Sequence, residues 1–149
     1  MADKSDLLLH FWLEQRNQAR QAETQRATMT NIILLVVAAA LGFAASHGVD
    51  QRSMLLVSIP MVGMGIFGAV ISMKYYERYS LHINYAQRLR LQLDQLEPTL
   101  RIMDEWSAAR REHYARYPWL HRMRLHHLWV LFHAGIATSG LVLTILILQ

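Results

Sequence analysis

The chain has no cysteine, only three prolines, and fewer acidic than basic side chains among its 149 residues. Without cysteine it cannot form a disulfide framework, a thiolate metal site or a thiol nucleophile. The prolines, Pro60, Pro98 and Pro118, are the expected places for a helix to kink or end. Hydrophobic residues make up 53% of the chain and charged residues only 17%.

The few charged residues avoid three parts of the chain completely. Residues 27–49, 53–73 and 128–149 contain no Asp, Glu, Lys or Arg, and these windows are 23, 21 and 22 residues long. A bilayer core about 30 Å thick needs roughly 20 helical residues. The pattern therefore predicts three membrane-spanning helices, with the first two, at about 28–48 and 53–73, forming a hairpin.

The Lys and Arg residues are distributed unequally on the two sides of these spans. Four precede the first span, ten lie between the second and third, and only Arg52 lies in the short loop of the hairpin. Because basic residues stay on the cytoplasmic side, the N-terminus and the central segment are expected to be cytoplasmic. The inner, or plasma, membrane is therefore the expected location, with a cytoplasmic N-terminus.

The segments outside the spans also have helical patterns, so we predict an all-α fold with a cytoplasmic helical stalk. Residues 1–26 read as a polar helix that runs into the first span, and residues 74–127 as a central helical segment. Apolar residues recur at three- and four-residue steps from Tyr76 to Leu96, which favours a helix that continues the second span. We expect it to stop near Pro98, helix to resume at Thr99, and a last helix to run from Trp119 through the third span, 128–149.

Small residues recur four apart within the spans. Gly42 follows Ala38, Ala69 follows Gly65, and Ser139 follows Gly135. Such spacing lets helix backbones approach closely inside a membrane. Gly63, Gly65 and Gly68 also spell a dinucleotide-binding pattern, but that pattern needs a strand-to-helix turn and here lies mid-span. We therefore predict helix packing by Gly42, Gly65, Gly68 and Gly135, either within one subunit or between subunits of a homo-oligomer.

Two regions are candidates for lining a pore. His133 is the ionisable side chain placed well within a span, where such groups act as relays, line pores or simply bond a neighbouring hydroxyl or carbonyl. Residues 15–26 are polar and show no stripe for packing on a core, so they could form a pore ring or an ordinary solvated helix. The candidate lining residues are Gln15, Arg16, Arg20, Arg26 and His133.

A basic run occupies residues 110–127, immediately before the third span. Its candidate phosphate-binding residues are Arg110, Arg111, Arg116, Arg122 and Arg124, and Tyr114, Tyr117 and Trp119 lie among them. Guanidinium groups and aromatic rings could hold a phosphate-bearing ligand such as a signalling nucleotide. Alternatively, the run anchors to anionic lipid headgroups, at about 1 kcal/mol per cation. Direct nucleic-acid binding is not expected.

Catalytic and cofactor motifs are missing. There is no Walker loop, no H-E-x-x-H and no nucleophile elbow, so we predict no catalytic residue, no metal and no cofactor. Arg116–His121 and Arg122–His127 do match the R-x4-H spacing of HEPN ribonucleases. With 13 Arg and 8 His in 149 residues, about 0.7 such matches arise by chance.

The layout of residues 16–96 resembles that of SLATT-type small membrane proteins of bacterial defence loci. A polar helix bearing Arg16 precedes a short-looped hairpin, which leads into a helix containing Tyr76, Arg78 and His82, followed by Ala86 and Arg88 to Arg90. The membrane accessory proteins of RNA-targeting CRISPR systems are more distantly similar. The resemblance implies an oligomeric membrane effector that permeabilises or depolarises the cell when a partner senses infection. The third span departs from the two-span pattern.

Three functions follow from these features as hypotheses. The first is a homo-oligomeric membrane effector of anti-phage defence that forms a pore or disrupts the membrane. The second is a non-conducting membrane anchor or scaffold for a cytosolic partner. The third is a membrane-tethered ribonuclease of the HEPN type.

Overall fold

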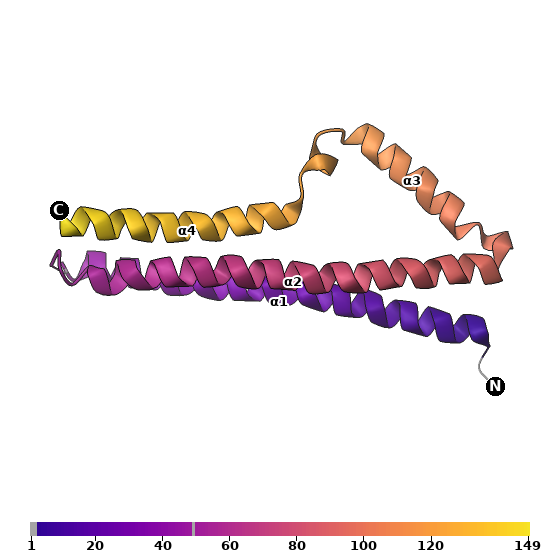
Figure 1. Ribbon diagram of the computed structural model, residues 1–149, viewed down its shortest axis with the longest axis horizontal. Helices are drawn as coiled ribbons and strands as arrows, with labels where there is room; N and C mark the ends of the chain where they lie inside the picture. The colour runs from indigo at the N-terminus through magenta and orange to yellow at the C-terminus, as the bar shows by residue number, and fades with distance from the viewer. Residues whose placement is uncertain (1–2, 49) are drawn as a thin grey trace. The chain divides into compact units, whose positions relative to one another are not determined.

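The protein is all α-helical, as predicted. The computed structural model describes residues 3–48 and 50–149. In chain order the helices are α1 (Lys4–Ser46), α2 (Leu55–Leu96), α3 (Ile102–Arg116) and α4 (Leu125–Leu148), shown in Figure 1. Short 3-10 helices, Pro98–Leu100 and Leu120–Arg122, precede and follow α3.

Three of these helices, α1, α2 and α4, are long and apolar enough to cross a membrane. They cover most of the three predicted windows, and the window residues His47, Gly48, Ser53, Met54 and Gln149 lie just outside the helices. Val49, the last residue of the first window, lies outside the described residues, as do residues 1 and 2. Helices α1 and α2 have 43 and 42 residues, about twice the length that a span needs. Both therefore continue beyond the apolar window as polar helix, as the sequence predicts.

Two predicted helix starts are wrong. Thr99 lies in a 3-10 helix, and α3 begins at Ile102 because Arg101 adopts the left-handed conformation with φ of 46°. The last helix begins at Leu125 and not at Trp119. A 3-10 turn at Leu120–Arg122 and the extended Met123 intervene.

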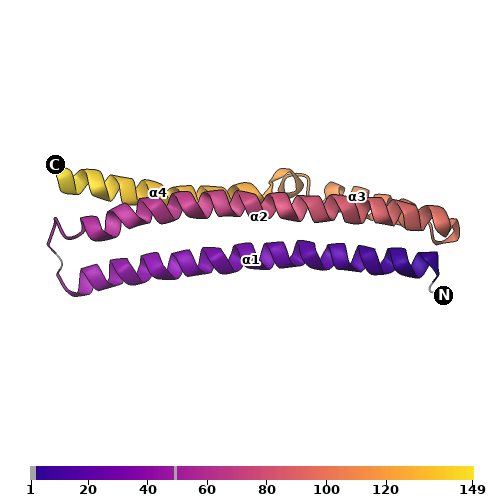
Figure 2. The ribbon, with the colours of Figure 1, turned by 60° about the horizontal axis from the view of Figure 1, so that its bottom comes forward.

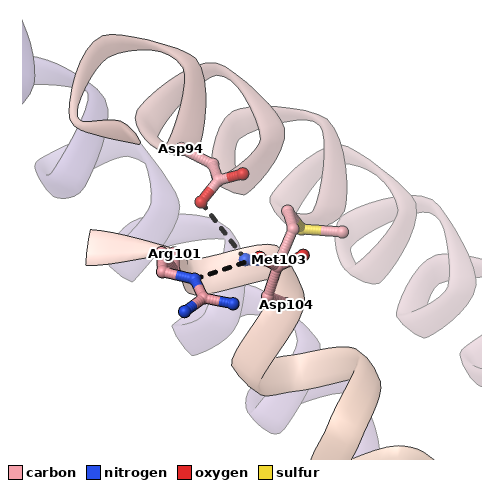
Figure 3. Close-up of polar contacts among 4 residues, drawn as sticks. All are labelled: Asp94, Arg101, Met103 and Asp104. Atoms are coloured by element: carbon pink, nitrogen blue, oxygen red, sulfur yellow. Dashed lines mark hydrogen bonds and ion pairs between the residues drawn. The ribbon is translucent and has the colours of Figure 1, made fainter. Parts of the chain in front are cut away.

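The corner between α2 and α3 is fixed by two carboxylates (Figure 3). Asp94 near the end of α2 accepts a hydrogen bond from the backbone N–H of Met103 at 3.2 Å. The first N–H groups of a helix have no partner inside it, so Asp94 supplies one from another helix. Arg101 also donates from Nε to Asp104 at 3.2 Å. The turn is thereby held by two short-range contacts, Asp94 with the Met103 backbone nine residues later and Arg101 with Asp104 three residues later.

The chain divides into two units. The first, here called the polar unit, comprises Met1–Glu23 and Tyr76–Arg124. It contains the first half of α1 and the second half of α2. Its buried apolar residues are Ala19, Ala22, Ala86 and Leu89, each at three-residue spacing on its own helix. The Nδ1 atom of His82 lies 2.7 Å from Oε1 of Gln15, so a hydrogen bond also joins the two helices.

The second unit, here called the spanning unit, comprises Thr24–Tyr75 and Leu125–Gln149. The ends of α1, α2 and α4 that it contains run side by side, and the 47–54 loop and the C-terminus lie at the same end (Figures 1 and 2). Ile33, Val37 and Met61 form its buried apolar core. Helix α1 ends as the chain enters Gly48, whose φ of +58° suits glycine after a helix.

Candidate functional site

The spanning unit holds a buried polar junction where α1, α2 and α4 meet. His133 on α4 and Thr30 on α1 are 1% and 4% exposed, and His133 Nε2 lies 3.1 Å from the Thr30 hydroxyl oxygen. Gly68 on α2 makes room for the imidazole, because a Cβ there would overlap the ring. Ser72, one turn further along α2, is 1% exposed. The junction therefore brings together side chains from three separate parts of the chain.

Several polar atoms at this end of the spanning unit lack a hydrogen-bond partner among the described residues. They include His133 Nδ1, the Ser72 hydroxyl and the Trp129 indole nitrogen, all buried. Buried polar groups are usually paired, so the junction is incompletely satisfied. Its residues line a space too small to admit a water molecule.

Arg26 lies beside this junction. It is 5% exposed, and its guanidinium carbon lies 5.4 Å from the centre of the Trp129 ring. A cation over an indole face is attracted by the ring quadrupole. Arg26 and His133, two of the predicted pore-lining residues, are thus both buried inside the spanning unit.

Helices α2 and α4 also approach closely near the loop end of the spanning unit. Thr144 donates a hydrogen bond to the Ser58 hydroxyl at 2.9 Å, and Ser58 is fully buried. A Cβ on Gly140 would lie 2.8 Å from the Ser58 carbonyl oxygen. Sequence reasoning missed Ser58, Gly140 and Thr144. The four-residue step from Gly140 to Thr144 is the signal that could have identified them.

The four glycines predicted to pack helices fall into two groups. Added Cβ atoms on Gly65 and Gly68 would overlap Ala137 and His133 of α4, so these glycines are used inside the subunit. A Cβ on Gly42 or Gly135 would meet nothing within 4 Å. Both of these glycines are exposed, as are Ala38, Ser46 and Ser139, which share their small-residue faces.

The polar stretch 15–26 differs from its expected form. It does carry a packing stripe, because Ala19 and Ala22 are buried and Gln15 is half-buried. The stripe consists of alanines, whose small side chains do not stand out as an apolar pattern in the sequence. Arg16 and Arg20 point away from it and are exposed. Whether any of the five candidate residues lines a pore stays a prediction.

Arg90 on α2 is a further charged residue of the polar unit. Its guanidinium carbon lies 4.3 Å from the centre of the Trp106 ring on α3, which joins the two helices. Burial, and secondarily the like charge of Arg16, lower the pKa of Arg90. Arg16 and Arg90 therefore repel each other within the polar unit.

The basic run is exposed throughout residues 110–124. Arg110 donates to the Tyr114 hydroxyl at 2.7 Å, and Arg116 pairs with Glu112 at 3.4 Å. In the other three predicted phosphate-binding residues, the guanidinium group makes no hydrogen bond or ion pair within the described part of the chain; they are Arg111, Arg122 and Arg124. They are available to an anionic partner.

The R-x4-H pair Arg116–His121 is engaged in other contacts. His121 stacks on Tyr114 with ring centres 4.5 Å apart, and its Nδ1 lies 3.0 Å from the Tyr117 carbonyl oxygen. Over residues 3–48 and 50–149, no group of three or more His, Asp or Glu side chains could hold a metal ion.

Chemically, the protein offers three features: a buried polar junction that holds helices together, exposed guanidinium groups, and open small-residue faces. Comparisons with protein-family models, curated proteins and solved structures found no match.

Proposed function

We propose that the protein is a homo-oligomeric membrane effector that forms a pore or disrupts the integrity of the membrane. The observation that carries this proposal is that only some of the small-residue faces are used for packing inside the subunit. Gly65, Gly68 and Gly140 are used between α2 and α4, whereas the faces around Gly42 and Gly135 remain open. Open faces of this kind favour contacts with helices of other subunits.

The apolar outer surface of the spanning unit supports the membrane location. Only 22%, 28% and 11% of the residues in the spanning windows of α1, α2 and α4 are buried. Large apolar side chains such as Leu35, Leu56 and Leu148 are more than 70% exposed. Their surroundings must be lipid or other subunits, because water would disfavour so much apolar surface. The distribution of Lys and Arg favours a cytoplasmic N-terminus. The resemblance to bacterial defence proteins implies that the membrane is a bacterial inner membrane.

A conducting path requires several subunits. The centre of one spanning unit is filled by Ile33, Val37 and Met61, so it leaves no aqueous channel. In a symmetric ring, the exposed Arg16 and Arg20 are the best placed of the candidate residues to face water near the cytoplasmic entrance. The resemblance to bacterial defence proteins would make loss of membrane potential the outcome of an infection signal.

Membrane potential in bacteria tests this proposal. The protein is induced in cells loaded with a potential-sensitive dye, with and without its neighbouring genes. We expect depolarisation within minutes for the natural chain and altered conduction for Arg20→Glu. Arg20 is the cleaner position, because Arg16→Glu also removes the repulsion of Arg90. An unchanged potential, with the protein confirmed in the membrane and its neighbours present, contradicts the proposal.

One observation favours a scaffold as the second candidate. Helix α3 has no buried residue and carries exposed Trp106 and Tyr114. Residues 108–116 of α3 are all exposed, so this part of the helix can dock a cytosolic partner. A scaffold would retain such a partner on membranes without changing the membrane potential.

Under the ribonuclease alternative, His121→Ala and His127→Ala would abolish ribonuclease activity.

A further inference from the structure

The spanning unit has an open cleft between α2 and α4, at the end where α4 begins. Its volume is about 420 Å³, and it is lined by Met73, His126, His127, Val130 and Leu131. Pockets of about 300–1,000 Å³ accommodate small molecules. The cleft is separate from the His133 junction, which lies further along α4 and shares none of its lining residues.

The floor of the cleft is apolar and continuous with the outer apolar surface. Met73 is the last residue of the second uncharged window and is 57% exposed, and Leu131 on α4 is 65% exposed. Val130 completes this floor. A surface of this kind at the edge of a spanning segment suits a hydrocarbon chain from the bilayer.

The remaining lining is polar and lies at the start of α4. The centres of the His126 and His127 rings lie 4.0 Å apart, and the rings meet edge to face. Each imidazole can donate an N–H to an anionic oxygen. Lys74, in the same unit, directly follows Met73, so the chain places a cation next to the cleft lining.

We propose that this cleft binds an anionic phospholipid, with an acyl chain along Met73, Val130 and Leu131 and the phosphate beside His126 and His127. The proposal rests on the membrane location that the proposed function assigns, but not on conduction. A soluble anion would make no use of the apolar floor. A zwitterionic lipid would gain less from a nearby cation such as Lys74, because its own cationic group is repelled by it.

Native mass spectrometry of the purified full-length chain in a neutral detergent tests lipid binding directly. Phosphatidylglycerol and phosphatidylcholine with the same chains are titrated separately. We expect phosphatidylglycerol to bind about tenfold more tightly, because both lipids offer the same phosphate but only phosphatidylcholine adds a choline cation, which Lys74 would repel. Glycerophosphoglycerol, which has the headgroup without chains, should not bind. Equal binding of the two lipids, or full binding of the chainless headgroup, overturns the proposal.

Two independent variants locate the site. His126→Leu combined with His127→Leu removes the N–H donors, and Val130→Phe fills the floor, so each should lower phosphatidylglycerol binding by about tenfold. Leu146→Phe is the matched control, because Leu146 is an exposed apolar residue on the same helix outside the cleft. Circular dichroism checks that each variant is folded. Binding that survives both cleft variants, or falls equally in the control, contradicts the assignment whatever the conduction result.

Discussion

At the residue scale, two buried hydroxyl groups lie beside His133, and only one of them has a hydrogen-bond partner among the described residues. Thr30 is hydrogen-bonded to His133, whereas the Ser72 hydroxyl has no partner among the described residues. Removing one member of a buried hydrogen bond leaves the other unsatisfied, while removing an unpaired hydroxyl leaves nothing behind. The two residues therefore form a natural pair of test and control.

Thr30→Val should destabilise the spanning unit by about 0.5–2 kcal/mol, the range for interhelical hydrogen bonds in membranes. Ser72→Ala should be neutral or slightly stabilising. Unfolding in mixed micelles of SDS and a mild detergent, followed by circular dichroism, measures both. A larger loss for Ser72→Ala than for Thr30→Val would show that the hydrogen bond is not what holds His133.

Asp50 gives the 47–54 loop a dependence on pH. A hydrogen bond from the Ser53 hydroxyl, then bonds from the backbone N–H groups of Ser53 and Arg52, lower the pKa of the Asp50 carboxyl. A carboxyl with a lowered folded-state pKa stabilises fully above its unfolded value of about 4 and loses this contribution as pH falls further. Amide exchange at Arg52 and Ser53 should therefore lose protection only below about pH 4. Loss already near pH 6, or an unchanged profile in Asp50→Ala, would contradict this role.

At the scale of elements, α3 depends on a cap from another helix. The Asp94 carboxylate accepts from Met103 N–H in the first turn of α3, and no side-chain cap comes from Arg101. Both side chains of the Arg101–Asp104 ion pair are 68% exposed, so this ion pair is a weak contact by comparison.

Asp94→Ala should cost about 0.5–2 kcal/mol of local stability at the start of α3, as for other lost helix caps. Asp104→Ala is the control and should cost under about 1 kcal/mol. Hydrogen exchange of residues 102–105 measures the local opening. Equal protection in the two variants would mean that Asp94 does not hold the helix.

The sequence predicts the long elements well and the short ones poorly. The uncharged windows locate α1, α2 and α4 because a bilayer imposes a minimum apolar length. The starts of α3 and α4 are missed, since the left-handed Arg101 and the 3-10 turn after Trp119 involve specific short-range contacts, such as the backbone hydrogen bonds from Arg101 to Pro98 and from Arg122 to Trp119. Periodicity alone contains no information about such contacts.

The candidate sites show the same division. Gly65 and Gly68 are found from their spacing, and their neighbours Ala137 and His133 are found only from the structure. The buried stripe of Ala19 and Ala22 was missed because alanine is both a weak hydrophobe and a good helix former. Which small-residue face is used inside the subunit is a property of three packed helices, and one sequence does not specify it.

On the scale of the whole molecule, the open faces around Gly42 and Gly135 are the proposed contacts between subunits. A leucine at either position would begin in open space, since no atom of a neighbouring helix lies within 4 Å of an added Cβ. It would, however, block close approach of a second helix. Gly42→Leu and Gly135→Leu should therefore leave the fold intact and weaken association. Gly63→Leu is the matched control, because Gly63 is also open but has no small residue four positions before or after it.

The most direct test is to count subunits in bilayer discs excised from the membrane by a copolymer, using stepwise photobleaching of a labelled chain. We predict several bleaching steps per particle for the natural chain and for Gly63→Leu. Mostly single steps are expected for Gly42→Leu combined with Gly135→Leu. Single steps for the natural chain at every expression level would contradict the oligomeric effector, whereas an unaltered step number in the double variant would place the subunit contacts elsewhere.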